Sequence, residues 1–275
     1  MEEKNEIYPR IILGLDVSTS CIGISIVEDT GDGIPKIIAI THKSPRIPRK
    51  IKGIEALCLR KNAFDDGFLK QIHEYCGDKK ITDVVIEEPL LSSNNVYTVG
   101  TLLRFNGMIA DAVYNTLGLV PNFISSYDAR LWSFPQLVSI RKHKKNGEEY
   151  PFKHIENALK KNETVLFGSY QFDVDKKTIM MNMVNEQYVG ENSVPWEYGK
   201  NGELKKENYD ACDSLICALA YININRYGVE KPVINDYNIQ ETKEEYIINY
   251  STKIWNKIFK KLIVLKKEKE NKENQ

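Results

Sequence analysis

The chain has 275 residues, of which 42% are apolar and 28% charged, and its 38 basic side chains balance its 38 acidic ones. These values are ordinary for a water-soluble globular protein with a substantial core. A formal net charge of zero excludes a partner selected by bulk charge alone.

The segment RIILGLDVSTSCIGISIVED predicts two strands joined by a turn of small residues. The first strand is apolar up to Asp16, the turn spans residues 18–20, and the second strand alternates from Ile22 to Val27. The Asp-Gly pair in DTGDGIP marks another turn, and KIIAITH is a third strand. These strands predict an antiparallel meander.

Helices and strands then alternate along the chain. Residues 50–76 predict a helix, whose apolar face holds Ile51, Ile54, Leu57, Cys58, Phe68, Leu69 and Ile72. ITDVVIEEP is a fourth strand buried on both faces and ended by Pro89. Residues 98–118 predict a helix with Gly118 as its C-cap, and VPNFISSYD is a fifth strand. This order predicts an α/β layered domain with a mixed sheet.

The second half of the chain is less regular. Residues 141–170 are polar and basic, so we expect an insertion or a mobile arm with weak helical character. KKTIMMNMVNEQY predicts a helix, VPWEYGKNGELKKEN a loop, and ENYDACDSLICALAY a buried helix. Residues 241–268 predict a basic, weakly amphipathic helix. We therefore expect a domain over residues 10–226 and a basic helical extension over 227–275.

Acidic side chains interrupt three apolar segments of this pattern. Asp16 ends the first strand, Glu87 ends the fourth, and Asp210 and Asp213 begin the buried helix. Residues three apart in a helix share a face, so the two aspartates point the same way. Taken alone, they are equally well explained as favourable charge at a helix N-terminus, and a glutamate at a strand end is unremarkable.

Bound metal ions would explain all three acidic positions at once. Clustered carboxylates repel each other unless a cation neutralises them. Oxygen ligands without His or Cys select Mg²⁺ or Mn²⁺, and two such ions about 4 Å apart stabilise the attacking and leaving oxygens of a phosphodiester. The pattern therefore indicates metal-dependent phosphodiester hydrolysis.

Together, the motifs IILGLDVSTSCIG, VVIEEPL and YDACDSLICALA resemble those of the RuvC-like Holliday junction resolvases of the RNase H-like superfamily. The resemblance spans residues 10–226 and implies a three-layer α/β fold with a five-stranded mixed sheet flanked by helices. The catalytic ligands that it implies for two Mg²⁺ ions, for which Mn²⁺ substitutes, are Asp16, Glu87, Asp210 and Asp213. The implied activity is symmetric cleavage of branched DNA, a four-way junction, by a homodimer whose interface includes the helix at 99–117.

Departures from the family pattern concern DNA binding. Three residues after the glutamate, where the family often has an aromatic wedge, this chain has Leu90, which can wedge a junction open but cannot stack on a base as a ring does. Lys176 and Lys177 match the family's basic residues before its third main helix, and each is equally well explained as solvated surface. Trp132 and Phe134 are expected to pack in the core or at its rim. Further candidates for phosphate contact, each equally well explained as solvated surface, are Lys142, Lys144 and Lys145.

Other functions remain open. GLDVSTSCIG also resembles the phosphate-binding hairpin of actin-like and sugar-kinase ATPases, but the sequence has neither the second such hairpin nor the adenosine loop of that fold. A non-catalytic junction-binding protein has no feature in its favour. An RNase H-like nuclease acting on flaps, forks or RNA–DNA hybrids is the serious alternative. The acidic residues specify the reaction, phosphodiester hydrolysis, but they do not specify which nucleic-acid structure is cleaved.

The remaining signals concern location and partners. The five cysteines contain no Cys-x-x-Cys pair, which predicts buried free thiols in a reducing compartment. The polar N-terminus is unlike a signal peptide, and no apolar run approaches the ~18 residues of a membrane span. We expect a cytoplasmic, nucleoid-associated protein, or one in the host cytoplasm if viral.

Two segments of the chain are strongly basic. They are residues 43–61, with seven Lys or Arg and one acid, and residues 252–275, with eight Lys and three Glu. Each is either a contact surface for a polyanion or a solvated helix face. No motor protein for branch migration or DNA packaging can be identified as a partner.

Overall fold

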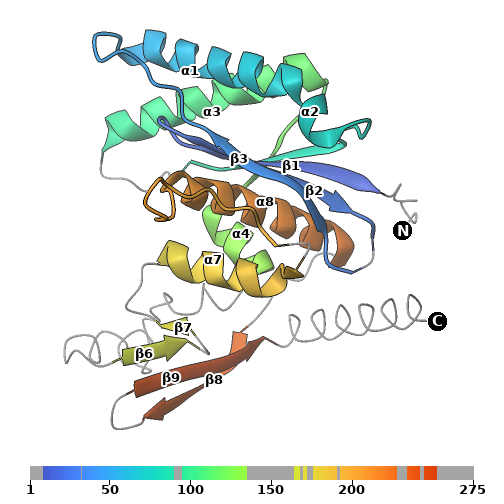
Figure 1. Cartoon of the computed structure of the whole chain (residues 1–275), viewed down its shortest axis with the longest axis vertical. Helices are drawn as coiled ribbons and strands as arrows, with labels where there is room; N and C mark the ends of the chain where they lie inside the picture. The colour runs from blue at the N-terminus through green and yellow to red at the C-terminus, as the bar shows by residue number, and fades with distance from the viewer. Residues whose placement is uncertain are drawn as a thin grey trace.

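The computed structural model of the chain describes residues 9–31, 33–89, 95–134, 164–167, 170–171, 176–190, 193–227, 234–241 and 245–252. In this part of the chain, a five-stranded sheet lies between two layers of helices, and a second, four-stranded sheet lies beyond one of these layers (Figure 1). The predicted α/β fold with a five-stranded mixed sheet is confirmed.

The larger sheet has the order β3-β2-β1-β4-β5. Its strands are β1 (Arg10–Val17), β2 (Ile22–Asp29), β3 (Lys36–Lys43), β4 (Asp83–Glu87) and β5 (Asn122–Ile124). The first three form the predicted antiparallel meander, and β4 and β5 run parallel to β1. β5 is shorter than the predicted strand, because the side chain of Ser125 accepts a hydrogen bond from the Asp128 N–H and starts a helix there.

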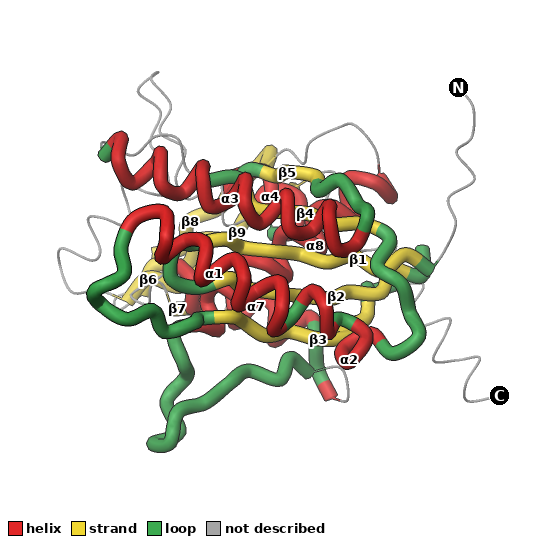
Figure 2. The backbone as a smooth tube through the Cα atoms, turned by 90° about the horizontal axis from the view of Figure 1, so that it is seen from above, coloured by secondary structure: helices red, strands yellow, loops and turns green. Residues whose placement is uncertain are grey.

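Helices of the first layer pack on one face of this sheet, where Figure 2 shows α1 and α3 side by side. They are α1 (Gly53–Gly67), the short η1 (Leu69–Gln71), α2 (His73–Cys76) and α3 (Val96–Leu117). The helix predicted over residues 50–76 is broken at Phe68, whose backbone is not helical. The predicted apolar face is wrong at Ile54 and Cys58, which are exposed. The apolar side chains that α1 buries are the predicted Leu57, together with Ala56 and Phe64.

The long helix α3 ends at the predicted residue. Its side chains Phe105, Ile109 and Val113 are fully buried in the core beneath this layer. The side chain of Asn95 caps its N-terminus, and Gly118 takes a left-handed conformation (φ 71°) as its C-cap. These two caps fix the length of the helix.

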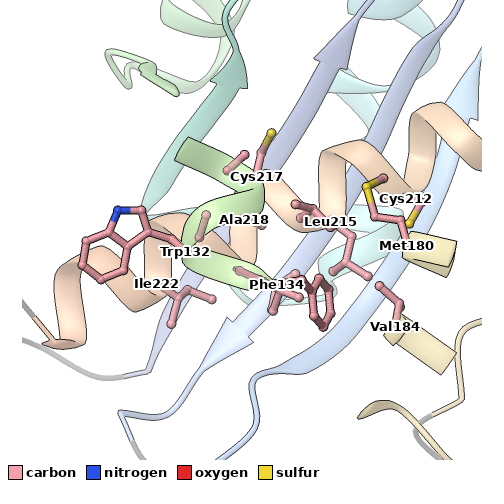
Figure 3. Packing of buried hydrophobic residues seen from close by; sticks show 14 of the residues in the cluster. Trp132, Phe134, Met180, Val184, Cys212, Leu215, Cys217, Ala218 and Ile222 are labelled. Atoms are coloured by element: carbon pink, nitrogen blue, oxygen red, sulfur yellow. The ribbon is translucent and has the colours of Figure 1, made fainter. Parts of the chain in front are cut away.

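The second helical layer covers the opposite face with α4 (Ser126–Ser133), α7 (Lys176–Gln187) and α8 (Glu207–Tyr227). Its core is drawn in Figure 3, and the labelled side chains from these helices and the residue after α4 are Trp132, Phe134, Met180, Val184, Cys212, Leu215, Cys217, Ala218 and Ile222. Trp132 and Phe134 are buried, as predicted. The spacing of the buried residues Leu215, Ala218 and Ile222 explains how α8 docks on the sheet.

The second sheet has the order β7-β6-β9-β8 and joins distant parts of the chain. Its strands are β6 (Thr164–Phe167), β7 (Tyr170–Gln171), β8 (Ile234–Glu241) and β9 (Glu245–Thr252). The helix predicted over residues 241–268 is wrong at β9, because its Tyr, Ile and Thr residues favour a strand and pair with both β8 and β6. Residues 253–268 lie outside the described part. The predicted insertion and the predicted extension therefore share one sheet.

All five cysteines lie in the described residues and are free thiols. Cys21, Cys76, Cys212 and Cys217 are buried free thiols, as predicted, whereas Cys58 is free and exposed. None of the helices in the described residues has both the length and the apolar character needed to cross a membrane.

Candidate metal centre

Strand alternation directs Asp16 and Glu87 to the same side of the sheet. β1 and β4 are adjacent and parallel, so their C-terminal ends meet at one edge. Ile12 in β1 and Val85 in β4 pack in the core beneath α8. Asp16 lies four residues after Ile12 and Glu87 two after Val85, so both belong to the face that α8 covers.

The helix α8 approaches this face closely because the facing strand residues are small. A Cβ atom on Gly14 would overlap the backbone carbonyl of Ser214, and one on Gly23 would overlap the backbone carbonyl of Asp210. Gly23 pairs with Asp16 across β1 and β2. The first turns of α8 therefore rest directly on the sheet beside Asp16.

This docking produces a trio of carboxylates, which we call the acid trio: Asp16, Glu87 and Asp213. Each offers an oxygen atom that lies within 4.8 Å of the other two. Asp213 is only 5% exposed, and the other two are partly buried. Asp210, three residues before Asp213, is not one of the three, although its charge acts on Asp16. The structure thus brings three of the four predicted ligands together, with Asp210 nearby.

The electrostatics of the acid trio favour a bound cation. Burial raises the pKa of Asp16 well above its usual range, and the negative charges of Glu87, Asp213 and Asp210 raise it further. A divalent cation between these oxygens would remove the repulsion.

The ligand atoms also fit a hard metal ion. The acid trio provides oxygen atoms alone, which Mg²⁺ and Mn²⁺ prefer. The Sγ atom of Cys217 lies 3.9 Å from Oε2 of Glu87. Burial, followed by the charge of Glu87, holds the pKa of this thiol well above its usual range, so it stays protonated and is a poor ligand. The predicted Mg²⁺ or Mn²⁺ site therefore fits the residues present.

Two cationic side chains flank Asp213. Nζ of Lys177 in α7 lies 3.2 Å from Oδ2 of Asp213 and 3.5 Å from Oδ1 of Asp210. Nη2 of Arg130 in α4 lies 3.6 Å from Oδ1 of Asp213. The second helical layer thus supplies one of the three acids and both of these cations.

Arg130 was not predicted as a site residue, because the residues before it, up to Asp128, were predicted to be a strand and no helix was predicted after them. The signal that could have found it is Ser125-x-x-Asp128, a pattern typical of a helix start. In the structure the Ser125 hydroxyl donates to the Asp128 carboxylate and accepts from its N–H. Recognising this start would have predicted α4, but not that Arg130 meets Asp213.

The predicted DNA contacts are only partly described. Lys176 begins α7, next to Lys177. Leu90, Lys142, Lys144 and Lys145 lie outside the described residues, and their roles stay predictions.

Replacing Asp16 by Asn is expected to raise the melting temperature of the metal-free protein near pH 8. Because the pKa of Asp16 is higher in the folded than in the unfolded state, its stabilising contribution is complete below the unfolded pKa of about 3.9 and is lost as the pH rises through the folded pKa. In EDTA, wild type should therefore lose stability relative to Asp16→Asn as the pH rises above about 4. Scanning calorimetry across this range measures the difference.

Addition of Mg²⁺ provides the control for this experiment. A ligand that binds only the folded state raises its melting temperature, so Mg²⁺ should stabilise the wild type more than Asp16→Asn. Identical melting curves for both proteins at every pH would contradict the repulsion ascribed to the acid trio.

The sequence matches no protein-family model and no curated protein. Among solved structures, the chain is similar to RuvC of Thermus thermophilus, with 14% identity and a TM-score of 0.45 over 81% of this chain and 99% of that one. It is similar to the yeast mitochondrial Holliday junction resolvase Ydc2, with 12% identity and a TM-score of 0.40 over 80% of each chain. It is also similar to a Ppx/GppA phosphatase of Aquifex aeolicus, with 14% identity and a TM-score of 0.32 over 79% of this chain and 90% of that one. The chemistry of the site rests on its own geometry and not on these likenesses.

Proposed function

We propose that this protein is a divalent-metal-dependent endonuclease and that branched DNA, in particular a four-way junction, is its substrate. The observation that carries the proposal is the acid trio, whose carboxylate oxygens lie within 4.8 Å of one another. Asp16 and Glu87, with Asp213 and Asp210 on α8, would hold two Mg²⁺ ions, for which Mn²⁺ substitutes. Bound in this way, the metal supplies Lewis acidity and a water of lowered pKa for attack on a phosphodiester.

The chain's own residues prepare this site before any ligand arrives. Asp16 and Glu87 belong to neighbouring strands of the central sheet, and Asp213 belongs to a helix whose backbone rests on that sheet. Carboxylates held on rigid elements need little reorganisation when they bind a cation. Lys177 is 41% exposed on its side chain and lies at the solvent side of Asp213, where it can contact a phosphate.

Two features support the finer proposal that a homodimer resolves Holliday junctions. The motifs around the acids resemble those of RuvC-like resolvases. The helix α3, predicted to form the dimer interface, leaves large apolar side chains exposed at its surface, namely Val96, Tyr97, Leu103 and Tyr114. Large exposed apolar patches mark protein interaction sites, and we propose that these side chains form the apolar part of the dimer interface. Two copies joined there would bring two sites to the two strands of one junction.

The proposal is tested with purified protein and a panel of DNA substrates. With Mg²⁺ or Mn²⁺, we expect cleavage of a four-way junction at symmetric positions, faster than cleavage of a Y-fork, a flap, a linear duplex or an RNA–DNA hybrid. Single-turnover rates on sequencing gels measure the preference, EDTA provides the metal-free control, and light scattering gives the oligomeric state.

Each outcome of the panel bears on one level of the proposal. Faster cleavage of another substrate would contradict the preference for four-way junctions but would agree with the proposed nuclease activity. No cleavage of any substrate with either metal would contradict the nuclease itself.

A further inference from the structure

Lys177 occupies an unusual place for a surface lysine. It lies in the first turn of α7, and its Nζ atom lies 3.2 Å from Asp213 and 3.5 Å from Asp210. It also lies 5.9 Å from the centre of the Tyr209 ring. The Asp213 side chain is only 6% exposed whereas that of Lys177 is 41% exposed. The side chain of Lys177 is therefore far more exposed than that of the acid it contacts.

The position of Lys177 conflicts with that of a metal ion. A divalent cation bound by the acid trio must contact Asp213, whose Oδ2 atom already faces the ammonium group. Two cations that share one carboxylate repel each other, and most strongly where burial lowers the dielectric constant. A bound divalent cation therefore makes the present position of the ammonium group, beside Oδ2 of Asp213, less favourable.

Arg130, the other cation beside Asp213, is placed differently. It lies 3.6 Å from the opposite oxygen, Oδ1, and its side chain is only 19% exposed. It extends from α4, which packs against α8. A lysine side chain has a flexible four-carbon stem, whereas guanidinium is planar and rigid. Of the two cations, Lys177 is the one that can turn outward without disturbing the core.

We propose that Lys177 is a built-in counter-ion of the acid trio, which withdraws when a divalent cation binds and then contacts a DNA phosphate. This inference rests on the proposed nuclease function and adds a coupling to it. The metal and the DNA both favour the withdrawn lysine. By linkage, each ligand then strengthens the binding of the other.

The first test measures metal binding without DNA. Calorimetric titration with Mn²⁺ is expected to show that Lys177→Met binds the ion about tenfold more tightly than wild type, within the 5–150-fold range typical of coupled sites. In EDTA the variant should melt at a lower temperature than wild type, because its acids have lost their counter-ion. Lys177→Gln, which stays polar, should give the same two changes.

Lys205→Met is the matched control. Lys205 is 42% exposed on its side chain and pairs with Glu197 at 2.7 Å, so it resembles Lys177 in exposure and in having an acidic partner. It is not paired with the acid trio, and its replacement is expected to leave the affinity for Mn²⁺ unchanged.

The second test measures the coupling between metal and DNA. Anisotropy of a labelled four-way junction, in EDTA and in Ca²⁺, gives the gain in DNA affinity that a divalent cation produces. This gain should be about tenfold smaller for Lys177→Met than for wild type. An equal gain in both proteins would overturn the coupling.

The failure of this inference can be told from the failure of the proposed function. Wild type that binds no Mn²⁺ would overturn the metal site and with it the proposed function. Wild type that binds Mn²⁺, together with a Lys177→Met variant of equal or weaker affinity, would overturn the counter-ion alone.

Discussion

Asp213→Asn is expected to lower the rate of Mg²⁺-supported cleavage by at least about 10³-fold, which corresponds to about 4 kcal/mol of transition-state stabilisation. Asp213 is the most buried member of the acid trio and lies between two cations. The amide keeps the shape of the side chain but removes the charge that a divalent cation needs. Single-turnover cleavage of a four-way junction measures the rate, and anisotropy should show that the junction still binds.

Two aspartates serve as comparisons for this loss. Asp210→Asn should cost less than Asp213→Asn, because Asp210 is not a member of the acid trio. Asp65→Asn should keep the cleavage rate while lowering the melting temperature, because Asp65 is also buried but bonds to Thr116 and Lys61 beside α3. If Asp213→Asn cleaved within tenfold of wild type, the assignment of Asp213 as a metal ligand would be wrong.

Gly23→Ala is expected to impair folding and cleavage together. The added Cβ atom would overlap the backbone carbonyl of Asp210, which cannot turn aside as a side chain can. Overpacking of this kind costs about 1–3 kcal/mol, and each kcal/mol lowers the melting temperature by roughly 2–4 °C for a chain of this size. Any shift of α8 also moves Asp213 away from Asp16, and a displacement of about 1 Å can cost about 10²-fold in rate.

Gly67→Ala is the matched control. Gly67 is the last residue of α1, and a Cβ atom there has no heavy atom within 4 Å beyond its own helix and chain neighbours. Alanine should therefore be tolerated there, since it favours a helix more than glycine does. Calorimetry and Mn²⁺ titration of both variants separate a steric effect from a general effect of replacing glycine. A Gly23→Ala protein with the melting temperature and cleavage rate of wild type would refute the close contact between α8 and the sheet.

The central sheet and most of the acid trio were predictable because their signals are local. Long apolar runs specify β1, β2 and β4, and an acid at the end of such a run is visible in the sequence itself. The apolar residues of α8 predict that this helix is buried, and residues 211–220 are all buried. That the strand ends and the helix start meet followed from family resemblance and not from the pattern alone.

The elements that were missed depend on contacts between distant residues. Alternation and amphipathy are weak in Glu245–Thr252, so pairing with β6 and β8 decides its conformation. The helix α4 is short and mixed in polarity, and its Trp132 is buried because it packs against residues of α8, which lie far away in sequence. The ion pairs of Arg130 and Lys177 with Asp213 also join residues that are far apart in sequence, so no local pattern predicts them.

The parallel pairing of β6 with β9 has a topological consequence for the metal centre. It joins Thr164–Phe167 to residues 245–248. The part of the chain between these two paired segments therefore forms a loop whose ends are held together. That loop contains α7 and α8, and hence Lys177, Asp210 and Asp213. Bringing the ends of a long segment together lowers its conformational entropy before the segment docks. The second sheet, to which no member of the acid trio belongs, thereby reduces the number of arrangements from which α8 must find its place on the central sheet.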